Sequence, residues 1–359
     1  MKNFFYKLLK ILATRILAKN PNIIIIGVTG SVGKSTTKEA IYTVLSNSNN
    51  FKNHVVKSEG NLNTEVGLPL TILRQNKSPK KFLWPFYLIW LFLIVFFSNP
   101  LRNIKILVLE YATNQPGDIK YLCSIAKPNI AVITKIAPAH IGYFGTLKNI
   151  AKEKGSLAYA VSKDGLVILN KNDVFSKNIA LTTNANIKYF DGKDFNNHIL
   201  IATIIAKYLN IDDQEIKSSL GSITKLPGRL NVIKGKKSTT IIDDTYNANP
   251  ESIKFALDFL EKYKSKGRKI AVLGDMLELG KMEIKYHREI GKLAKKKSDI
   301  LILTGPKFNE VLSDAWFINS EKTAEYLLKN MKKNDIILVK GSNAMKMNMV
   351  VQKIRSYSS

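Results

Sequence analysis

The stretch from Ile23 to Thr37, IIIIGVTGSVGKSTT, constrains the fold more than any other part of the chain. Its run of isoleucines suits a parallel strand that is covered on both faces. The glycines after it let the backbone curl with its N–H groups toward an anion, and the start of a helix adds its positive end. Lys34 supplies a charge for phosphate oxygens, and Ser35 supplies a hydroxyl for a magnesium ion. The sequence therefore predicts a phosphate-binding loop of a variant kind, because Val28 stands where a small residue is usual; an ordinary strand–turn–helix corner is the alternative.

The composition limits the classes of protein to consider. A chain of 359 residues with 45% hydrophobic residues can form two domains with real cores. One cysteine, Cys123, excludes a disulfide framework and fits a reducing compartment. The net charge of +27 indicates an anionic membrane surface or phosphate-rich substrates, unless an AT-rich genome explains the lysines. Nucleic acid is not expected as a partner, because no arginine-rich run or interleaved aromatics occur.

Two apolar segments suggest a membrane surface. Residues 1–20 form a basic amphipathic helix that either lies on a membrane or packs on its own domain. Residues 82–97, FLWPFYLIWLFLIVFF, would span about 24 Å as a helix, short of the roughly 30 Å hydrocarbon core. A single crossing would also separate strands of one sheet. We expect this run to dip into one leaflet and return, with Pro85 and Pro100 at its bends; a buried helix or a partner interface is the alternative.

The remaining chain alternates strands and helices. Apolar strands at 104–110 and 129–134 should join the phosphate-loop strand in one sheet, and strand 165–170 follows. From about residue 222 the pattern restarts, with strands and helices at 239–244, 250–263, 269–273, 283–296, 299–304, 320–331, 335–340 and from about 345. The predicted fold class is α/β, a P-loop-type central ATPase domain with a mainly parallel sheet plus a C-terminal Rossmann-like domain. The predicted domains are the helix 1–20, the ATP-binding domain 21–222 with an apolar insertion at 76–103, and the C-terminal domain 223–359.

Polar residues follow the predicted strands where ligands usually bind in open sheets. Glu110 ends one strand and His140 follows another, so both should face the crevice that holds Lys34. Lys154 lies on the next helix. The stretch 58–69, SEGNLNTEVGLP, is dense in Gly and Asn and predicts a shaped loop.

Several motifs in order resemble the Mur ligases, ATP-dependent enzymes that form amide bonds in peptidoglycan synthesis. The resemblance covers about residues 21–355. Within the family it is most similar to members that add D-alanyl-D-alanine to a UDP-linked muramoyl tripeptide. The motifs are TGSVGKSTT at 29–37, NLNTEVGLP at 61–69, LE at 109–110 with QPGDI at 115–119, PAH at 138–140, DDTYNANP at 243–250, GDMLELG at 274–280, His287 and KGS at 340–342.

Three features depart from the family pattern. The N-terminal domain that holds the UDP group is not found, which leaves the UDP-linked substrate open and suggests a partner chain that supplies substrate binding. The stretch at 180–200 is short, and the adenine-contacting pattern is not recognisable around Phe195–His198. Lys135 stands where the family usually has Asn.

The resemblance implies ATP and Mg²⁺ as cofactors and an acyl-phosphate intermediate. It implies catalytic roles for Lys34, Glu110, His140 and Lys154. It implies Mg²⁺ ligation by Ser35, Glu110, His140 and Lys154 as a carbamate. ATP would contact Thr29, Gly30, Ser31, Val32, Gly33, Lys34, Ser35, Thr36, Arg229, Tyr246 and Asn247. Asn63, Thr64, Asp275 and Glu278 would bind substrate. For Lys154, Glu110, His140 and Asp275, ordinary structural roles are the alternatives.

The expected activity is an ADP-forming acid–amino-acid ligase that joins a D-Ala-D-Ala-like amine to a muramoyl-peptide precursor. The expected location is cytoplasmic, peripheral or monotopic on the inner membrane face. A ligase with another acceptor, similar to folylpolyglutamate synthases, and a membrane-tethered ATP-binding partner without catalysis are the alternatives. The set Lys34, Glu110, His140 and Lys154 argues against the last.

Overall fold

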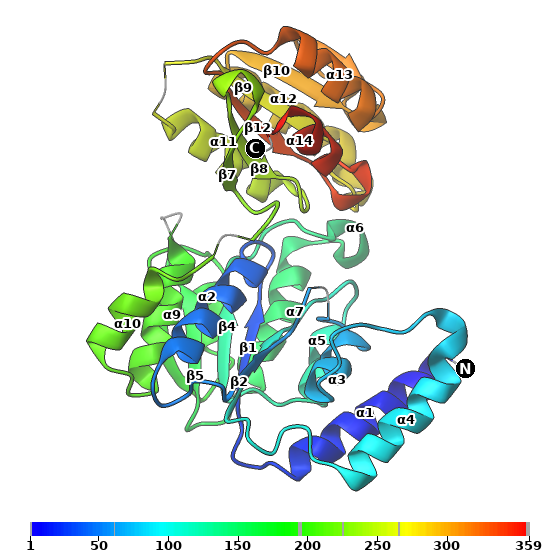
Figure 1. Cartoon of the computed structure of the whole chain (residues 1–359), viewed down its shortest axis with the longest axis vertical. Helices are drawn as coiled ribbons and strands as arrows, with labels where there is room; N and C mark the ends of the chain where they lie inside the picture. The colour runs from blue at the N-terminus through cyan, green and yellow to red at the C-terminus, as the bar shows by residue number, and fades with distance from the viewer. Residues whose placement is uncertain (1, 61, 193–195, 225, 265, 357–359) are drawn as a thin grey trace. The chain divides into compact units, whose positions relative to one another are not determined.

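The chain forms two compact units in a computed structural model, drawn in Figure 1. The structure describes residues 2–60, 62–192, 196–224, 226–264 and 266–356. Unit 1 comprises Met1–Ile136 and Thr146–Thr224, and unit 2 comprises Ala137–Gly145 and Lys225–Ser359. Asn61, in the predicted loop, and Phe195 lie outside the described residues.

Unit 1 is built on a six-stranded parallel sheet in the order β2-β3-β1-β4-β5-β6. The prediction that strand 104–110 joins the phosphate-loop strand in one sheet is confirmed, since β1 pairs with β3, and β4 pairs with β1 on its other side. Except for the edge strands β2 and β6, the strands are almost wholly buried, which explains their unbroken apolar sequences. The strands are β1 Ile24–Thr29, β2 Val55–Lys57, β3 Ile106–Glu110, β4 Ile130–Ile133, β5 Leu166–Asn170 and β6 Asn186–Phe190.

Helices cover both faces of this sheet. On one face α2 packs with α9 and α10, and on the other α7 packs with α5 and α8 (Figure 1). Ile26, Val108 and Val132 of the strands meet Ile41 of α2 and Ile205 of α9 in one apolar core. The helices are α2 Lys34–Asn47, α3 Gly67–Ile72, α5 Asp118–Cys123, α7 Leu147–Tyr159, α8 Ser176–Ala180, α9 Asn197–Tyr208 and α10 Asp213–Leu220.

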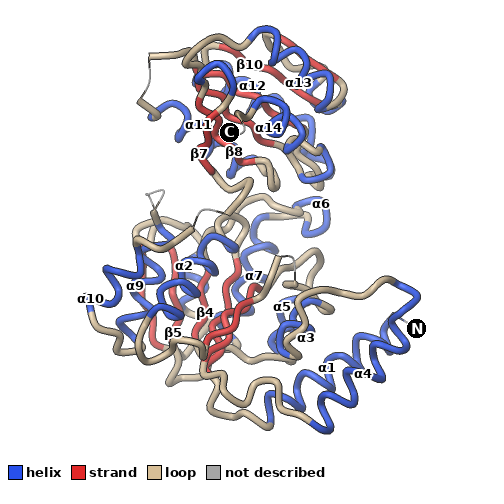
Figure 2. The backbone as a smooth tube through the Cα atoms, in the orientation of Figure 1, coloured by secondary structure: helices blue, strands red, loops and turns tan. Residues whose placement is uncertain are grey.

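The two apolar segments of unit 1 form a pair of helices that lie side by side, as Figure 2 also shows. They are α1 Lys2–Ala18 and α4 Trp84–Phe97, the latter preceded by the 3₁₀ turn η1 Lys81–Leu83. The apolar stripe of α1, with Leu9, Leu12 and Ile16, is buried, so for this stripe packing on its own domain is the correct alternative. By contrast, α4 buries only Leu91 and Val95, so it is not a buried helix.

Unit 2 contains a second six-stranded sheet in the order β11-β10-β9-β12-β8-β7, in which only β7 runs antiparallel to its neighbour. α11 and α12 cover one face, and α13 and α14 the other. The strands are β7 Asn231–Lys234, β8 Thr240–Asp244, β9 Lys269–Gly274, β10 Ile300–Thr304, β11 Ala315–Phe317 and β12 Ile336–Lys340. The helices are α6 Ile141–Phe144, α11 Pro250–Lys262, α12 Glu283–Lys297, α13 Ser320–Asn330 and α14 Asn348–Ile354, with 3₁₀ turns η2 Lys236–Ser238, η3 Gly280–Met282, η4 Pro306–Phe308 and η5 Asn343–Met345.

The loop predicted over 58–69 ends earlier than expected, because α3 begins at Gly67. At Gly67 a Cβ atom would lie 2.3 Å from the Leu62 Cα atom, so only glycine allows the loop to fold back onto this helix. Among the described residues, no helix has the length and the apolar character needed to cross a membrane.

The two faces of α4 should respond differently to truncation. Leu91 is wholly buried whereas Leu93 is 45% exposed. We expect Leu91→Ala to destabilise the protein by about 2–4 kcal/mol, because it leaves a cavity at a fully buried position. Leu93→Ala should cost less than about 0.5 kcal/mol in solution. Urea unfolding followed by circular dichroism measures both, and equal effects would contradict the orientation of α4.

Candidate active site

The predicted phosphate loop is tied to the segment after β4. The Thr134 hydroxyl donates to the carbonyl of Val32 at 2.6 Å, and the Ser31 N–H donates to the carbonyl of Lys135 at 2.6 Å. Gly30 has φ of 144°, and a Cβ atom there would lie 1.9 Å from Thr134 Oγ1. This position therefore requires glycine, and the loop keeps its curled shape through its neighbour in the sheet.

The loop leads directly into α2. Gly33 precedes the helix with φ of 85°, and among the described residues no side chain caps this end. An uncapped N-terminus with a preceding glycine turn is suited to anion binding. Lys34 Nζ donates to the carbonyl of Gly30 at 2.9 Å, which holds the ammonium group over the loop. Thr36 is half-buried on the first turn of α2, and Thr29 Oγ1 donates to the carbonyl of Tyr111 at 2.8 Å.

Glu110 is the centre of a polar cluster beside the loop. Its carboxylate accepts from Ser35 Oγ at 2.9 Å and from Asn63 Nδ2 at 3.1 Å. Its N–H donates to Ser58 Oγ at 3.0 Å, so the strand end is fixed from both sides. The side chain is 3% exposed. The structure thus brings together Lys34, Ser35, Glu110 and Asn63. Thr64 follows Asn63 in the chain, and its carbonyl accepts a hydrogen bond from Leu68 N.

Glu153 and Lys154 are adjacent on α7 but differ in their surroundings. The Glu153 carboxylate accepts from the N–H groups of Gly117 and Ile119 at 2.8 and 2.7 Å, which fixes the turn before α5. Lys154 is fully buried, and burial together with the nearby Lys34 lowers its pKa to about 7, while Glu153 and Glu110 act in the opposite direction. Close to neutral pH a large share of the Lys154 amine is therefore unprotonated.

His140 belongs to unit 2 and contacts Glu278. Its Nδ1 atom lies 2.6 Å from Glu278 Oε2, although the approach is poorly aligned with the ring N–H direction. The His140 ring lowers the pKa of Glu278. Both residues have positive φ, 56° and 65°, which is uncommon for non-glycine residues. The backbone supports the pair, since Gly142 N donates to the carbonyl of Glu278 at 3.1 Å.

A second polar cluster forms at the carboxyl end of β8. The Arg229 guanidinium stacks 3.7 Å from the centroid of the Tyr246 ring. Asp243 and Asp244 accept from the N–H groups of Gly228 and Leu230, both at 3.1 Å. These carboxylates therefore hold the 228–230 turn that carries Arg229.

Lys340 completes this cluster. Its ammonium donates to Asp244 Oδ2 at 2.6 Å and to the carbonyl of Asn247 at 2.8 Å. Burial raises the pKa of Asp244, and Lys340 opposes the shift. The buried ion pair therefore fixes the backbone of Asn247.

Asp275 is buried away from solvent. It is 1% exposed and accepts from Lys307 N at 3.1 Å, so it holds the η4 turn. Burial raises its pKa to about 6. His287, also buried, accepts from Met276 N at 3.0 Å and donates to the carbonyl of Glu283 at 2.8 Å. Asp275 and His287 are thus buried beneath the 275–280 loop, and their hydrogen bonds hold its first residues and the η4 turn in place.

The oxygen donors of Ser35 and Glu110 fit a magnesium ion, because Mg²⁺ prefers oxygen ligands and these two lie 2.9 Å apart beside the phosphate loop. No cluster of three or more His, Cys, Asp or Glu side chains suited to a metal occurs in the described part of the chain. A metal here would need phosphate or modified-lysine oxygens in addition to the protein's carboxylate and hydroxyl.

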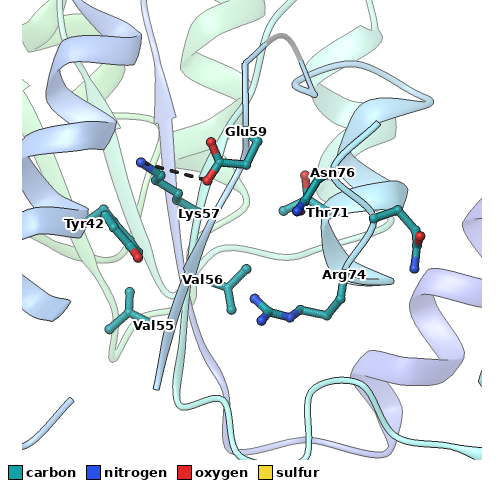
Figure 3. Close-up of a pocket in the computed structure, with 9 residues that line it drawn as sticks. Tyr42, Val55, Val56, Lys57, Glu59, Thr71, Arg74 and Asn76 are labelled. Carbon is teal, nitrogen blue, oxygen red and sulfur yellow. Dashed lines mark ion pairs between the residues drawn. The ribbon is translucent and has the colours of Figure 1, made fainter. Parts of the chain in front are cut away.

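A surface hollow that is open to solvent lies elsewhere in unit 1, at the edge strand β2 (Figure 3). Lys57 in its wall lies 4.0 Å from Glu59 and 4.5 Å from the centroid of the Tyr42 ring. None of the predicted site residues lines it.

Sequence reasoning gave no role to three residues that support the site. Ser58 was only part of a predicted loop, and Glu153 is the residue before Lys154 on its helix. Lys340 ends a buried strand, and a charged residue at such a position is the signal that could have identified it.

Two sequence families match the chain. Residues 28–84 and 91–234 match the Mur ligase middle domain, and residues 228–343 match the Mur ligase, glutamate ligase domain. The break at 85–90 falls within α4.

Individual relatives agree with the family matches. UDP-N-acetylmuramoyl-tripeptide–D-alanyl-D-alanine ligase of Buchnera aphidicola subsp. Baizongia pistaciae is 30% identical over 93% of this chain and 75% of its own length. The crystal structure of MurF ligase from Thermotoga maritima in complex with ADP is similar with a TM-score of 0.79 and 28% identity, over 97% of this chain and 83% of that one. A MurF structure from Acinetobacter baumannii shares the fold with a TM-score of 0.80 at 23% identity, over 96% and 79%.

The buried amine of Lys154 should make stability depend on pH. Its pKa is about 7 in the folded protein and near 10.5 when exposed, so folding excludes a proton that the unfolded chain binds. As the pH falls from 10 to 7, the free energy of unfolding of the wild type should decrease by about 1.4 kcal/mol per pH unit relative to that of Lys154→Met. Below pH 7 this difference should become constant. Urea unfolding in CO₂-free buffers measures it. A difference independent of pH would contradict the burial of an ionisable amine.

Proposed function

Because the chain belongs to the Mur ligase family, we propose that it is an ADP-forming amide ligase that joins D-alanyl-D-alanine to a UDP-linked muramoyl tripeptide. The relatives named as such ligases support the substrates. The observation that carries the chemistry is the Ser35–Glu110 contact of 2.9 Å beside the phosphate loop, because it gathers oxygen ligands where a nucleotide's terminal phosphates would lie.

ATP is the phosphate donor in this proposal. The backbone of residues 29–33 and the first turn of α2 hold the β- and γ-phosphates, and Lys34 neutralises charge that develops during transfer. Ser31, Val32 and Thr36 contribute through their positions in the loop and the first turn. In unit 2, Tyr246 and Asn247 contact the adenine and ribose, and Arg229 contacts the γ-phosphate. The stacking of Arg229 on Tyr246 supports a common role for the two residues.

Magnesium would be held by Ser35 and Glu110, with His140 and a carbamate of Lys154 as further ligands. When bound, it neutralises charge on the phosphates and the substrate carboxylate. Lys154 fits this role because carbon dioxide reacts with a neutral amine, and burial beside Lys34 favours that form. Asn63 orients the Glu110 carboxylate by its hydrogen bond, so that the other oxygen faces Ser35.

The reaction then has two steps. A carboxylate oxygen of the muramoyl peptide attacks the γ-phosphorus of ATP, and ADP leaves. The amine of D-alanyl-D-alanine attacks the acyl carbonyl, inorganic phosphate leaves, and the amine loses a proton. Asn63 and Thr64 bind the peptide substrate, and Glu278 contributes to the amine site. Asp275 is too deeply buried for direct contact, so we propose that it supports this site through the 305–308 turn.

The location of the enzyme is also a proposal. We propose that it works in the cytoplasm on the inner face of the cell membrane, supported by the exposed apolar face of α4. A partner chain that supplies part of the substrate site stays a prediction from the sequence.

Purified protein with ATP and Mg²⁺ should release phosphate only when UDP-linked muramoyl tripeptide and D-alanyl-D-alanine are both present, because the acyl phosphate needs both a carboxylate and an amine. Lys34→Met should reduce the rate at least roughly a hundredfold. A coupled phosphate assay with mass spectrometry of the product measures both. Phosphate release with glutamate as the amine would indicate a different ligase, and ATP binding without turnover would refute the enzyme assignment.

Lys154→Arg should lose activity by roughly a hundredfold or more, because arginine keeps a positive charge but cannot form a carbamate. In ¹³C-bicarbonate the wild type should show a carbamate signal by NMR that the variant lacks. Lys152→Arg, on the exposed side of the same helix, is the matched control. A signal that persists in Lys154→Arg would place the carbamate elsewhere.

Glu278→Gln should weaken Mn²⁺ binding by roughly tenfold, because the negative charge of Glu278, 2.6 Å from His140 Nδ1, favours a proton on that nitrogen and so leaves Nε2 as the ligand atom. Electron paramagnetic resonance of bound Mn²⁺ and the ¹⁵N shifts of His140 measure the two effects. Glu310→Gln breaks an exposed pair with Arg288 and is the control. Unchanged His140 shifts in Glu278→Gln would contradict this positioning.

A further inference from the structure

We propose that the outward face of α4, bordered by cations of α1 and of the segment before α4, docks flat into one leaflet of an anionic lipid bilayer. The inference rests on the membrane location proposed above and gives it a surface, an orientation and a lipid class. It does not depend on the ligase reaction.

The outward face of α4 is the largest concentration of exposed apolar side chains in the described residues. Nine of the twenty large apolar side chains exposed there lie between residues 82 and 97. Their spacing by three and four residues places most of them on one stripe of the helix. Phe86 is 73% and Phe97 80% exposed. The stripe comprises Phe82, Phe86, Ile89, Leu93, Phe96 and Phe97.

The opposite face of α4 is already occupied. Leu91 and Val95 are buried, and Phe5 of α1 packs edge-on against Trp84 with 4.4 Å between ring centroids. Lys19 Nζ donates to the carbonyl of Val95 at 2.6 Å, and the side chains of Asn20 and Asn99 exchange hydrogen bonds at 2.8 and 3.0 Å. The helix is thus held in place, and its outward stripe cannot rotate inward without breaking these contacts.

The connections of α4 exclude a crossing. The helix has 14 residues, about 21 Å at 1.5 Å per residue, which is less than a hydrocarbon core. The chain reaches it from β2 by way of α3 and returns to β3, and these two strands are parallel neighbours. Both ends of the insertion therefore lie on one side of any bilayer, so the helix lies in the plane of the surface.

The charges beside this face complement an anionic surface. Residues 1–20 contain five Lys and Arg, residues 70–105 contain six, and neither segment contains Asp or Glu. Lys7, Lys77 and Lys80 are exposed. The Arg15 guanidinium lies 5.3 Å from the centroid of the Phe96 ring, so a cation borders the apolar stripe itself. Cations on flexible stems beside an embedded apolar face suit a lipid headgroup layer.

The same charges argue against a second copy of the chain as the occupant. A two-fold interface would place this face against itself, and the two acid-free segments would then repel each other. Trp90, 45% exposed on α4, suits the headgroup boundary, where tryptophan is enriched.

Flotation with phosphatidylcholine vesicles, with and without phosphatidylglycerol, tests the proposal. The full chain should float with the anionic vesicles and much less with the neutral ones, and added salt should release it. The triple variant Phe86→Ser, Leu93→Ser, Phe97→Ser should reduce the bound fraction roughly tenfold. Lys7→Gln, Lys77→Gln, Lys80→Gln should reduce the preference for anionic vesicles.

A control variant removes three apolar side chains elsewhere that are at least as exposed as those of α4. Val174→Ser, Leu181→Ser, Leu312→Ser alters side chains that are 80–86% exposed and lie outside α1 and α4, and it should float like the wild type. Phosphate release with soluble substrates should be the same in all variants, which separates failure of docking from failure of the ligase. Equal flotation of the α4 variant and wild type would overturn the proposal. So would a lipid-free dimer that the α4 variant alone dissociates, which would assign the face to a second copy.

Discussion

The parallel pairing of β1 with β3 decides where the polar residues of unit 1 can meet. Its register sets Val28 beside Glu110, so the carboxylate ends its strand where the phosphate loop begins. Every later contact depends on that register: Ser35 reaches Glu110 from the first turn of α2, and Asn63 reaches it from the loop after β2. A shift by one residue would turn the Glu110 side chain to the opposite face of the sheet and remove the acceptor from both.

The sequence was sufficient to predict the helices and strands that have a strong local pattern. The buried strands of both units and helices α11 to α14 of unit 2 lie within a few residues of their predicted ranges, because unbroken apolar runs and glycine turns are local signals, whereas α5, α8, α9 and α10 were given no range. It missed β2, β6, β7 and β11, which have three to five residues at or near the sheet edges, where half-exposed strands have little apolar pattern. The start of α3 was missed because its cause is a close approach of Gly67 to Leu62, which no local pattern reveals.

The candidate site also contains residues that the sequence could predict and contacts that it could not. Lys34, Ser35, Glu110 and Lys154 could be found from motifs, since their positions follow strands and helices in a fixed order. The contacts that build the two polar clusters could not be found in this way. Asn63 on Glu110, Glu153 on the 117–119 turn and, in unit 2, Lys340 on Asp244 join residues 34 to 96 positions apart. The exposed face of α4 could not be predicted from the sequence either. An evenly apolar helix has no stripe, and only its packing on α1 determines which side remains exposed.

The place where α4 joins the sheet differs from the place where the phosphate loop lies. The segment after α4 enters β3 at its amino end, whereas Glu110 and the phosphate loop lie at the carboxyl ends of β3 and β1. Along β3 these two ends lie about 16 Å apart, at roughly 3.3 Å for each of its five residues. In the proposed docking, the end of the sheet that carries the proposed ATP site is therefore not the end that α4 joins.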